Sequence, residues 1–229
     1  MLLSFPNWII HISSALEWGI GAFLIFRYGT LTGRRNIRLF GLAMLPHWLG
    51  SFFVLGYHIS TDSIPLLLDM SEVINFFGSI SLLWATLNLL KATGKNPAAG
   101  GYTAALAAIV FSGKPQSYMG ADIFDTILQL SSIVYLTFLV LLLVLYRRDR
   151  TVFSPLTIAG FWFVLVFISV TVFCIYLATD VRGYPTLSHD DLLHGLAESL
   201  LTVSNLMIAF GAHRKIREFE AGQLQKVQG

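Results

Sequence analysis

The chain has 229 residues, of which 55% are hydrophobic and 12% charged, and its mean hydropathy is +0.69. Soluble domains contain about 25% charged residues, so this composition excludes an ordinary water-soluble globule and indicates an integral membrane protein. The formal net charge of +2 excludes a nucleic-acid-binding chain, because it provides no basic field to hold phosphates. The single cysteine, Cys174, excludes an internal disulfide, a Cys-based zinc site and covalently attached haem.

Apolar runs long enough to cross a bilayer follow one another along the chain. A membrane-spanning helix needs about 20 apolar residues. Six runs meet this length: Trp8–Arg27, Leu39–His58, Ile64–Leu90, Ile123–Tyr146, Pro155–Tyr176 and Leu192–Ala212. His11 and Glu17 interrupt the first run, so we expect a retained span there rather than a cleaved signal peptide.

Basic residues set the expected orientation of these runs. They follow the first, third, fourth and sixth runs: Arg34, Arg35, Arg38, Lys91, Lys95, Arg147, Arg148, Arg150, Arg214, Lys215 and Arg217. Because Lys and Arg concentrate in cytoplasmic loops, these four run ends are predicted to lie on the cytoplasmic or stromal side. The third and fourth runs can both end there only if the chain crosses once between them, and the short apolar segment 98–111 is the candidate for that crossing.

The sequence therefore predicts an all-α polytopic membrane protein with seven transmembrane helices, the N-terminus outside or lumenal and the C-terminus cytoplasmic or stromal. Six helices remain if segment 98–111 does not span. Residues 41–57 align with residues 160–176, and Glu72 aligns with Glu198, which predicts a 3+1+3 parallel repeat of the kind found in small transporters. The predicted units are a first three-helix repeat at 1–96, a linker with the short crossing helix at 97–122, a second three-helix repeat at 123–213 and a polar tail at 214–229.

Polar side chains within the predicted spans are candidates for a functional site, because each ionisable group in a bilayer costs roughly 3 kcal/mol. The last helix carries the clearest pattern, since His194, Glu198 and Asn205 lie on one face, which must contact protein or water rather than lipid. We expect His194 and Glu198 near the outer end of the bundle, close to His58, with Glu72 on the opposite wall. The candidate intramembrane polar site comprises His194, Glu198, Asn205, Glu72, His58 and Glu17. The alternative is that these groups only form hydrogen bonds between helices.

Histidines within the spans are candidate ligands of a pigment or haem, because neutral imidazole binds haem iron and chlorophyll magnesium. The four candidates are His11, His47, His58 and His194. His47 and His58 lie about 16 Å apart along one helix, so they cannot bind one metal ion together. No clustered Cys and His pattern occurs, so the sequence predicts no metal site. The alternative for each histidine is an interhelical hydrogen bond.

Two parts of the sequence resemble uncharacterised membrane domains of cyanobacteria and plastids. The N-terminal resemblance lies in residues 3–14 and in the pairs Glu17-Trp18, Pro46-His47 and Tyr57-His58. The C-terminal resemblance lies in residues 193–198, with the sequence LHGLAE, and in their continuation to Leu206. The chain thus resembles a hypothetical plastid reading-frame family, with an N-terminal and a C-terminal domain fused. The resemblance implies a thylakoid or plasma membrane of oxygenic phototrophs, and it supplies no catalytic residues.

Three functions remain open. In the first, the protein is a small subunit or an assembly and stability factor of a photosynthetic membrane complex. Its candidate cofactors are then chlorophyll, carotenoid or haem, and its partners are membrane lipid and that complex. In the second, it transports protons or a small solute. In the third, it is a membrane enzyme acting on a lipid, quinone or carotenoid, with a glutamate as acid or base. We favour the first, non-enzymatic function.

Overall fold

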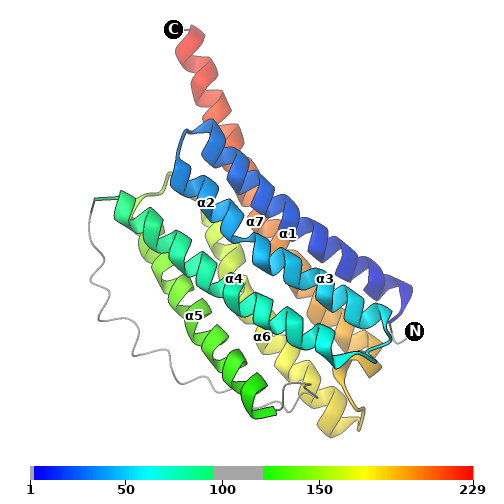
Figure 1. The fold of residues 1–229 in the computed structure, drawn as a ribbon. Helices are drawn as coiled ribbons and strands as arrows, with labels where there is room; N and C mark the ends of the chain where they lie inside the picture. Colours follow the sequence, from blue (N-terminus) through cyan, green and yellow to red (C-terminus); the bar gives the residue numbers. More distant parts are fainter. Residues whose placement is uncertain (1–2, 95–120, 229) are drawn as a thin grey trace.

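A computed structural model describes residues 3–94 and 121–228, and no strand occurs among them (Figure 1). The long helices, in chain order, are α1 (Phe5–Leu31), α2 (Arg35–Ala43), α3 (Leu45–Ile59), α4 (Pro65–Ala92), α5 (Ala121–Arg148), α6 (Pro155–Tyr176) and α7 (Asp191–Gln228). A π-helical turn, η1 (Leu177–Val181), and a 3-10 turn, η2 (Leu187–His189), connect α6 to α7. Six helical stretches of the described chain are long and apolar enough to cross a membrane, with α2 and α3 together forming one of them. The predicted crossing at 98–111 lies outside the described residues.

Serine and proline mark the beginnings of α1 and α6. The hydroxyl of Ser154 accepts a hydrogen bond from the backbone N–H of Thr157 at 3.1 Å, and Pro155 occupies the first turn of α6. Ser4 caps α1 in the same way, again with a proline in the first turn. The serine satisfies a free N–H of the first turn, and proline loses no helical bond there. These local signals begin both helices.

The predicted second run is divided into α2 and α3, which meet at Met44. Pro46 causes the break, because proline has no N–H to continue the helical hydrogen bonds. Neighbouring helices satisfy the carbonyls at the break. The indole N–H of Trp18 donates to the carbonyl of Met44 at 2.9 Å, and the hydroxyl of Ser81 donates to that of Ala43 at 2.6 Å. A helix break at membrane depth requires such partners.

The helices pack as a bundle in which α7 contacts both α1 and α6, and α4 contacts both α3 and α5 (Figure 1). The N-termini of α1 and α7 and the C-terminus of α3 lie at one end of the bundle. At the opposite end, α7 extends beyond the other helices (Figure 1). Arg34, in the turn after α1, forms an ion pair with Asp149, just after α5, at 2.7 Å. The turns after α1 and α5 therefore meet at that opposite end.

The ends of α4 and α5 bear on the predicted seventh crossing. The amide of Asn36 donates to the carbonyl of Asn88 at 3.4 Å, which places the end of α4 beside the turn after α1. Both α4 and α5 therefore end where α1 ends, and α5 begins at the other end of the bundle (Figure 1). The extra crossing was predicted because the third and fourth runs were both expected to end on the same side, and α4 and α5 do end at the same end of the bundle.

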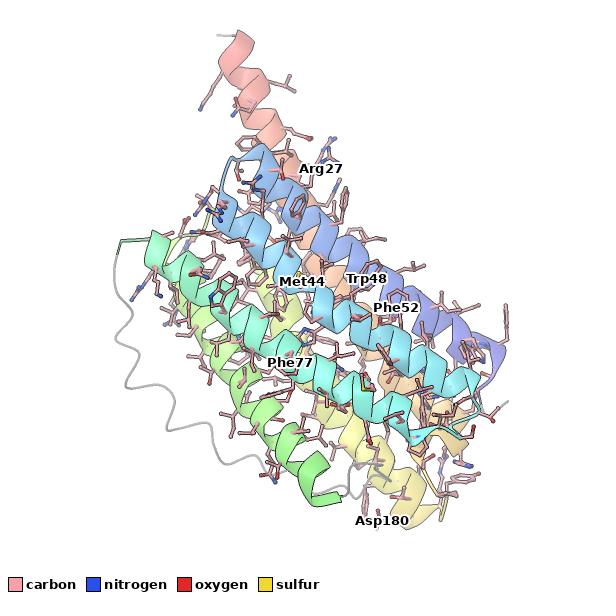
Figure 2. The ribbon with its side chains drawn as sticks, viewed as in Figure 1. Arg27, Met44, Trp48, Phe52, Phe77 and Asp180 are labelled. Atoms are coloured by element: carbon pink, nitrogen blue, oxygen red, sulfur yellow. The ribbon has the colours of Figure 1, made fainter. Side chains whose placement is uncertain are left out.

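Aromatic residues fill the centre of the bundle. Phe40, Phe138 and Phe161 are fully buried, with ring centroids 5.4 to 6.2 Å apart. Large apolar side chains also cover the outside, and Phe52 and Phe77 are exposed on α3 and α4 (Figure 2). An apolar exterior around an apolar core is what a bilayer requires, and it agrees with the predicted membrane class.

Candidate metal centre

Three buried histidines from three helices meet near the end of the bundle where α1 and α7 begin. They are His11 on α1, His58 on α3 and His194 on α7. The Nε2 atoms of His11 and His194 are 3.0 Å apart. The ring centroid of His11 lies 4.7 Å from that of His58, and those of His58 and His194 are 5.2 Å apart. One ligand atom from each ring lies within 4.8 Å of the other two. We call these residues the histidine cluster.

Carboxylates lie behind two of the three rings. Nδ1 of His58 donates a hydrogen bond to Oδ1 of Asp62 at 2.9 Å, and Nδ1 of His11 lies 3.8 Å from Oε2 of Glu198. The hydrogen bond to Asp62 occupies Nδ1 of His58 and leaves its Nε2 for the cluster, whereas Nδ1 of His11 faces Glu198 beyond hydrogen-bond distance and its Nε2 meets His194. Metal-binding histidines commonly use this arrangement, because a carboxylate on one nitrogen fixes the tautomer that leaves the other free as a ligand. Nδ1 of His194 is buried and has no hydrogen-bond partner in the described part of the chain.

The turn after α3 brings Asp62 back to His58. Thr61 and Asp62 have φ angles of 56° and 60°, and the N–H of Asp62 donates to the carbonyl of Tyr57 at 3.0 Å. Left-handed backbone is strained at a β-branched residue such as Thr61, and such strain concentrates at functional sites. Burial alone would raise the pKa of Asp62, but hydrogen bonds with His58 and Ser188 hold that pKa below its ordinary value.

Hydrogen bonds fasten α1 to α7 on both sides of the cluster. Toward the end of the bundle, Oδ1 of Asp191 accepts from the backbone N–H of Ser4 and from the amide of Asn7, each at 2.7 Å. Deeper in the bundle, the amide of Asn205 donates to the carbonyl and the hydroxyl of Ser14, both at 3.0 Å. Asn205, a predicted site residue, therefore makes the interhelical contact given above as the alternative.

The connection from α6 to α7 closes this end of the bundle. Arg182, after η1, forms an ion pair with Asp190, whose carboxylate also accepts from the backbone N–H of Leu193 at 3.2 Å. Asp190 thereby caps the helix that carries His194. Ser188 in η2 is buried against the turn that holds Asp62.

Other predicted residues lie outside the cluster. Glu72 belongs to α4, which packs mainly on α3, α5 and α2, and its place on the wall opposite His194 stays a prediction. Glu17 lies farther along α1, with one buried oxygen that has no hydrogen-bond partner among the described residues. His47 packs separately, with its ring centroid 5.6 Å from that of Trp18.

The sequence does not reveal the cluster as a metal site, because its three members are far apart in the chain. A usable signal was present, since His58 and His194 are each followed four residues later by an acid, Asp62 and Glu198. No sequence spacing links either pair to His11. The prediction of no metal ligands is therefore replaced by the proposal made below.

The geometry of the cluster suits a small ion. Zn–N bonds are about 2.0–2.1 Å long, so tetrahedral geometry places ligand nitrogens about 3.4 Å apart. The observed separations, from 3.0 Å for the closest pair to at most 4.8 Å, bracket that value. The three rings are in mutual contact, which leaves no flat space between them for a porphyrin. This argues against haem or chlorophyll as the ligand at this position.

Two family models match the chain, one in each half. Residues 2–88 match "Protein of unknown function (DUF2499)", and residues 124–217 match "Protein of unknown function (DUF3593)". The Ycf49-like protein of Synechocystis is 28% identical over 85 residues, which are 36% of this chain and 82% of that relative. No solved structure matches the chain. The chain therefore belongs to an uncharacterised cyanobacterial and plastid family and carries both domains in one polypeptide.

The cluster takes residues from both matched domains. His11 and His58 lie in the first and His194 in the second. The Synechocystis relative is about 104 residues long, since 85 residues are 82% of it, and this is too short for both domains. The joining of two domains thus completes the cluster in this chain.

Proposed function

We propose that this membrane protein of phototrophs binds one transition-metal ion between α1, α3 and α7, with His11, His58 and His194 as ligands. The observation that carries the proposal is the convergence of three buried imidazoles, one from each helix, with ligand atoms within 4.8 Å of one another. Three histidine ligands leave a fourth coordination position, which water or another small molecule fills in zinc sites of this type. Loading requires the Nε2 atoms of His11 and His194 to separate by about 0.4 Å, and the most distant pair of ligand atoms to approach by up to about 1.4 Å.

The carboxylates support metal binding over packing alone. Imidazoles that only join helices need hydrogen-bond partners, and the 3.0 Å contact between Nε2 of His11 and Nε2 of His194 is such a bond. Joining helices requires no carboxylates, yet the outer nitrogens of His58 and His11 face Asp62 and Glu198. The transporter hypothesis requires a water-filled cavity, and the contact between the three rings does not favour such a cavity at this position.

We further propose that the protein is a small subunit or assembly factor of a photosynthetic membrane complex, in the thylakoid or plasma membrane. The cyanobacterial source of the relative supports this place. The grouping of Arg34, Arg148 and Lys215 toward one end of the bundle supports a cytoplasmic or stromal position for that end. The histidine cluster would then lie near the lumenal or outer surface. Affinity purification from native membranes tests this part, and a partner list without any photosynthetic protein would contradict it.

We also propose that the two three-helix units of the chain form a parallel structural repeat. A two-fold relation between units 1–96 and 123–213 would exchange α1 with α5 and α4 with α7, and the packing of α1 on α7 and of α4 on α5 fits that exchange. Against it, α1 packs closely on α2, whereas α5 makes little contact with α6. The aligned positions of His11 and His58 are Gln129 and Leu177, so the repeat would contain the cluster only once.

Metal content of the purified protein tests the metal proposal. The chain is produced with an affinity tag that lacks histidine, loaded with Zn²⁺, desalted and measured by inductively coupled plasma mass spectrometry. We expect one ion per wild-type chain and less than about one tenth of that in His58→Gln and His194→Gln. His213→Gln is the matched control, because His213 is an exposed imidazole on α7 away from the cluster.

Circular dichroism must show wild-type helix content in the two cluster variants, so that a loss of metal is not a loss of fold. A wild-type protein without bound metal would refute the proposal. An equal loss in His213→Gln would refute it too, since binding would then be adventitious.

A further inference from the structure

The carboxylates around the histidine cluster specify the charge of the ion, and this inference rests on the proposed function. We infer that the site selects a divalent transition-metal ion, and that Asp62 and Glu198 are positioning residues that impose this selection. They act through the imidazoles of His58 and His11.

The ligand atoms narrow the class of ion first. Three imidazole nitrogens suit Zn²⁺, Fe²⁺, Co²⁺, Ni²⁺ and copper, whereas Mg²⁺ and Ca²⁺ require oxygen ligands. Zinc, iron, cobalt, nickel and copper therefore remain, and copper also occurs as monovalent Cu⁺ under reducing conditions. Ligand type alone does not separate Cu⁺ from the divalent ions.

The balance of charge distinguishes Cu⁺ from the divalent ions. The ion-pair partners of Asp62 and Glu198 in the described chain are the imidazoles of His58 and His11, and no Lys or Arg pairs with either acid there. A divalent ion bound to neutral imidazoles is neutralised by these two carboxylates. Cu⁺ would leave one negative charge uncompensated, which is costly at the buried end of a membrane bundle. Their side chains are only 7% and 20% exposed, so water screens this charge poorly.

The two acids at the N-terminus of α7 have partners outside the cluster. Asp190 pairs with Arg182. Asp191 accepts from Ser4 and Asn7 at the N-terminus of α7, where the helix dipole favours a negative charge. Neither contacts a ring of the cluster through a hydrogen bond in the described chain. Asp191 also interacts electrostatically with His194, but its charge is balanced by the hydrogen bonds from Ser4 and Asn7 and by the helix N-terminus. The carboxylates that face the rings of the cluster without such compensation are those of Asp62 and Glu198.

Metal preference, rather than metal content, tests this inference. Apparent affinities of the full-length protein in detergent are measured for Zn²⁺ and, under reductant, for Cu⁺, by competition with chromophoric chelators, with Mg²⁺ as a third ion. We expect Asp62→Asn and Glu198→Gln each to weaken Zn²⁺ binding about 10- to 100-fold, as loss of such partners does in other metal sites. Cu⁺ binding should change about threefold or less, and Mg²⁺ should not bind any variant.

Glu218→Gln is the matched control. It is the same change on α7, at an exposed carboxylate that pairs with Arg214 and Lys215, and its affinities should equal those of wild type. The visible spectrum of Co²⁺ at saturation should be the same in all variants, which shows that the three imidazoles still bind in the same geometry. A variant that lost this spectrum would contradict an indirect role for its carboxylate.

The inference fails if the wild type binds metal but both carboxylate variants leave the Zn²⁺ to Cu⁺ preference unchanged. It also fails if wild type prefers Cu⁺. The absence of any metal from wild type would refute the proposed function instead, so the two failures are distinguishable.

Discussion

Gly195 follows His194 on α7, and the side chain of Asn7 from α1 occupies the space where a larger residue would place its Cβ. A Cβ at position 195 would lie 2.1 Å from Oδ1 of Asn7, whereas ordinary contact begins at 3.4 Å. In Gly195→Ala, Asn7 must therefore move by about 1.3 Å. Asn7 is 4% exposed, and its amide donates to the backbone carbonyl and the carboxylate of Asp191, both at 2.7 Å.

The cost follows from these two hydrogen bonds. A bond to a neutral acceptor contributes about 1 kcal/mol and a bond to a charged one about 2 kcal/mol. Alanine returns up to about 1 kcal/mol, because it forms helix better than glycine. We therefore expect Gly195→Ala to lower the free energy of unfolding by about 2 kcal/mol. It should also weaken Zn²⁺ binding, because Asn7 anchors the end of α1 that carries His11.

Reversible unfolding in mixed detergent micelles, followed by circular dichroism, measures the change in the free energy of unfolding. Gly56→Ala is the matched control, two residues before His58 on α3, where the nearest atom to a new Cβ is 3.6 Å away. It should be neutral or stabilising by up to about 1 kcal/mol. In an Asn7→Ala background the obstacle is gone, so Gly195→Ala should cost nothing there. Equal effects of Gly195→Ala in both backgrounds, or stability equal to that of Gly56→Ala, would refute this reasoning.

Three further predictions concern the rest of the bundle. Asn205→Ala removes two hydrogen bonds between α7 and α1 and should lower the unfolding free energy by about 1 kcal/mol in the same assay; no change would show that these bonds contribute nothing. Burial alone would raise the pKa of Asp149, but hydrogen bonds from Thr151 and Arg34 hold this pKa below its ordinary value. The ionised carboxylate of Asp149 therefore stabilises the folded state at pH values above the unfolded-state pKa. This stabilisation is lost as the pH falls through the lowered pKa of the folded state. Acid unfolding curves should show a smaller loss in Arg34→Gln, and an unchanged loss would disprove the linkage. Cysteines placed at positions 34 and 215 (natively Arg34 and Lys215) should be labelled from the same, cytoplasmic or stromal, side of the membrane; labelling from opposite sides would overturn the topology.

The membrane spans could be predicted from the sequence because bilayer thickness dictates the length of an apolar run. The C-terminal end of α7 could not be predicted in this way. The predicted span ends at Ala212, whereas the helix continues to Gln228. Its extension is polar and is supported by ion pairs one turn apart, such as that between Arg214 and Glu218, and hydropathy carries no signal for them.

The sequence predicts the end of the bundle at which a site residue lies, because chain direction determines it. It does not predict which helices contact one another, because packing determines that. His58 at the end of one span and His194 at the beginning of another must lie at the same end of the bundle, and the structure places their ring centroids 5.2 Å apart. Which helices touch is a tertiary property, so the sequence indicated His11 only as a separate pigment or haem ligand. The place expected for Glu72 opposite His194 likewise depends on tertiary packing, and α4 packs mainly on α3, α5 and α2.

The most direct test of the metal centre is the X-ray absorption spectrum of wild-type protein loaded with one equivalent of Zn²⁺. We predict three imidazole nitrogens at about 2.0–2.1 Å, recognised by the outer-shell scattering of the rings, with one further light ligand. In His58→Gln the imidazole count should fall. A shell of oxygen atoms only, or a wild-type spectrum that His58→Gln reproduces unchanged, would contradict the assignment of the histidine cluster as a metal centre.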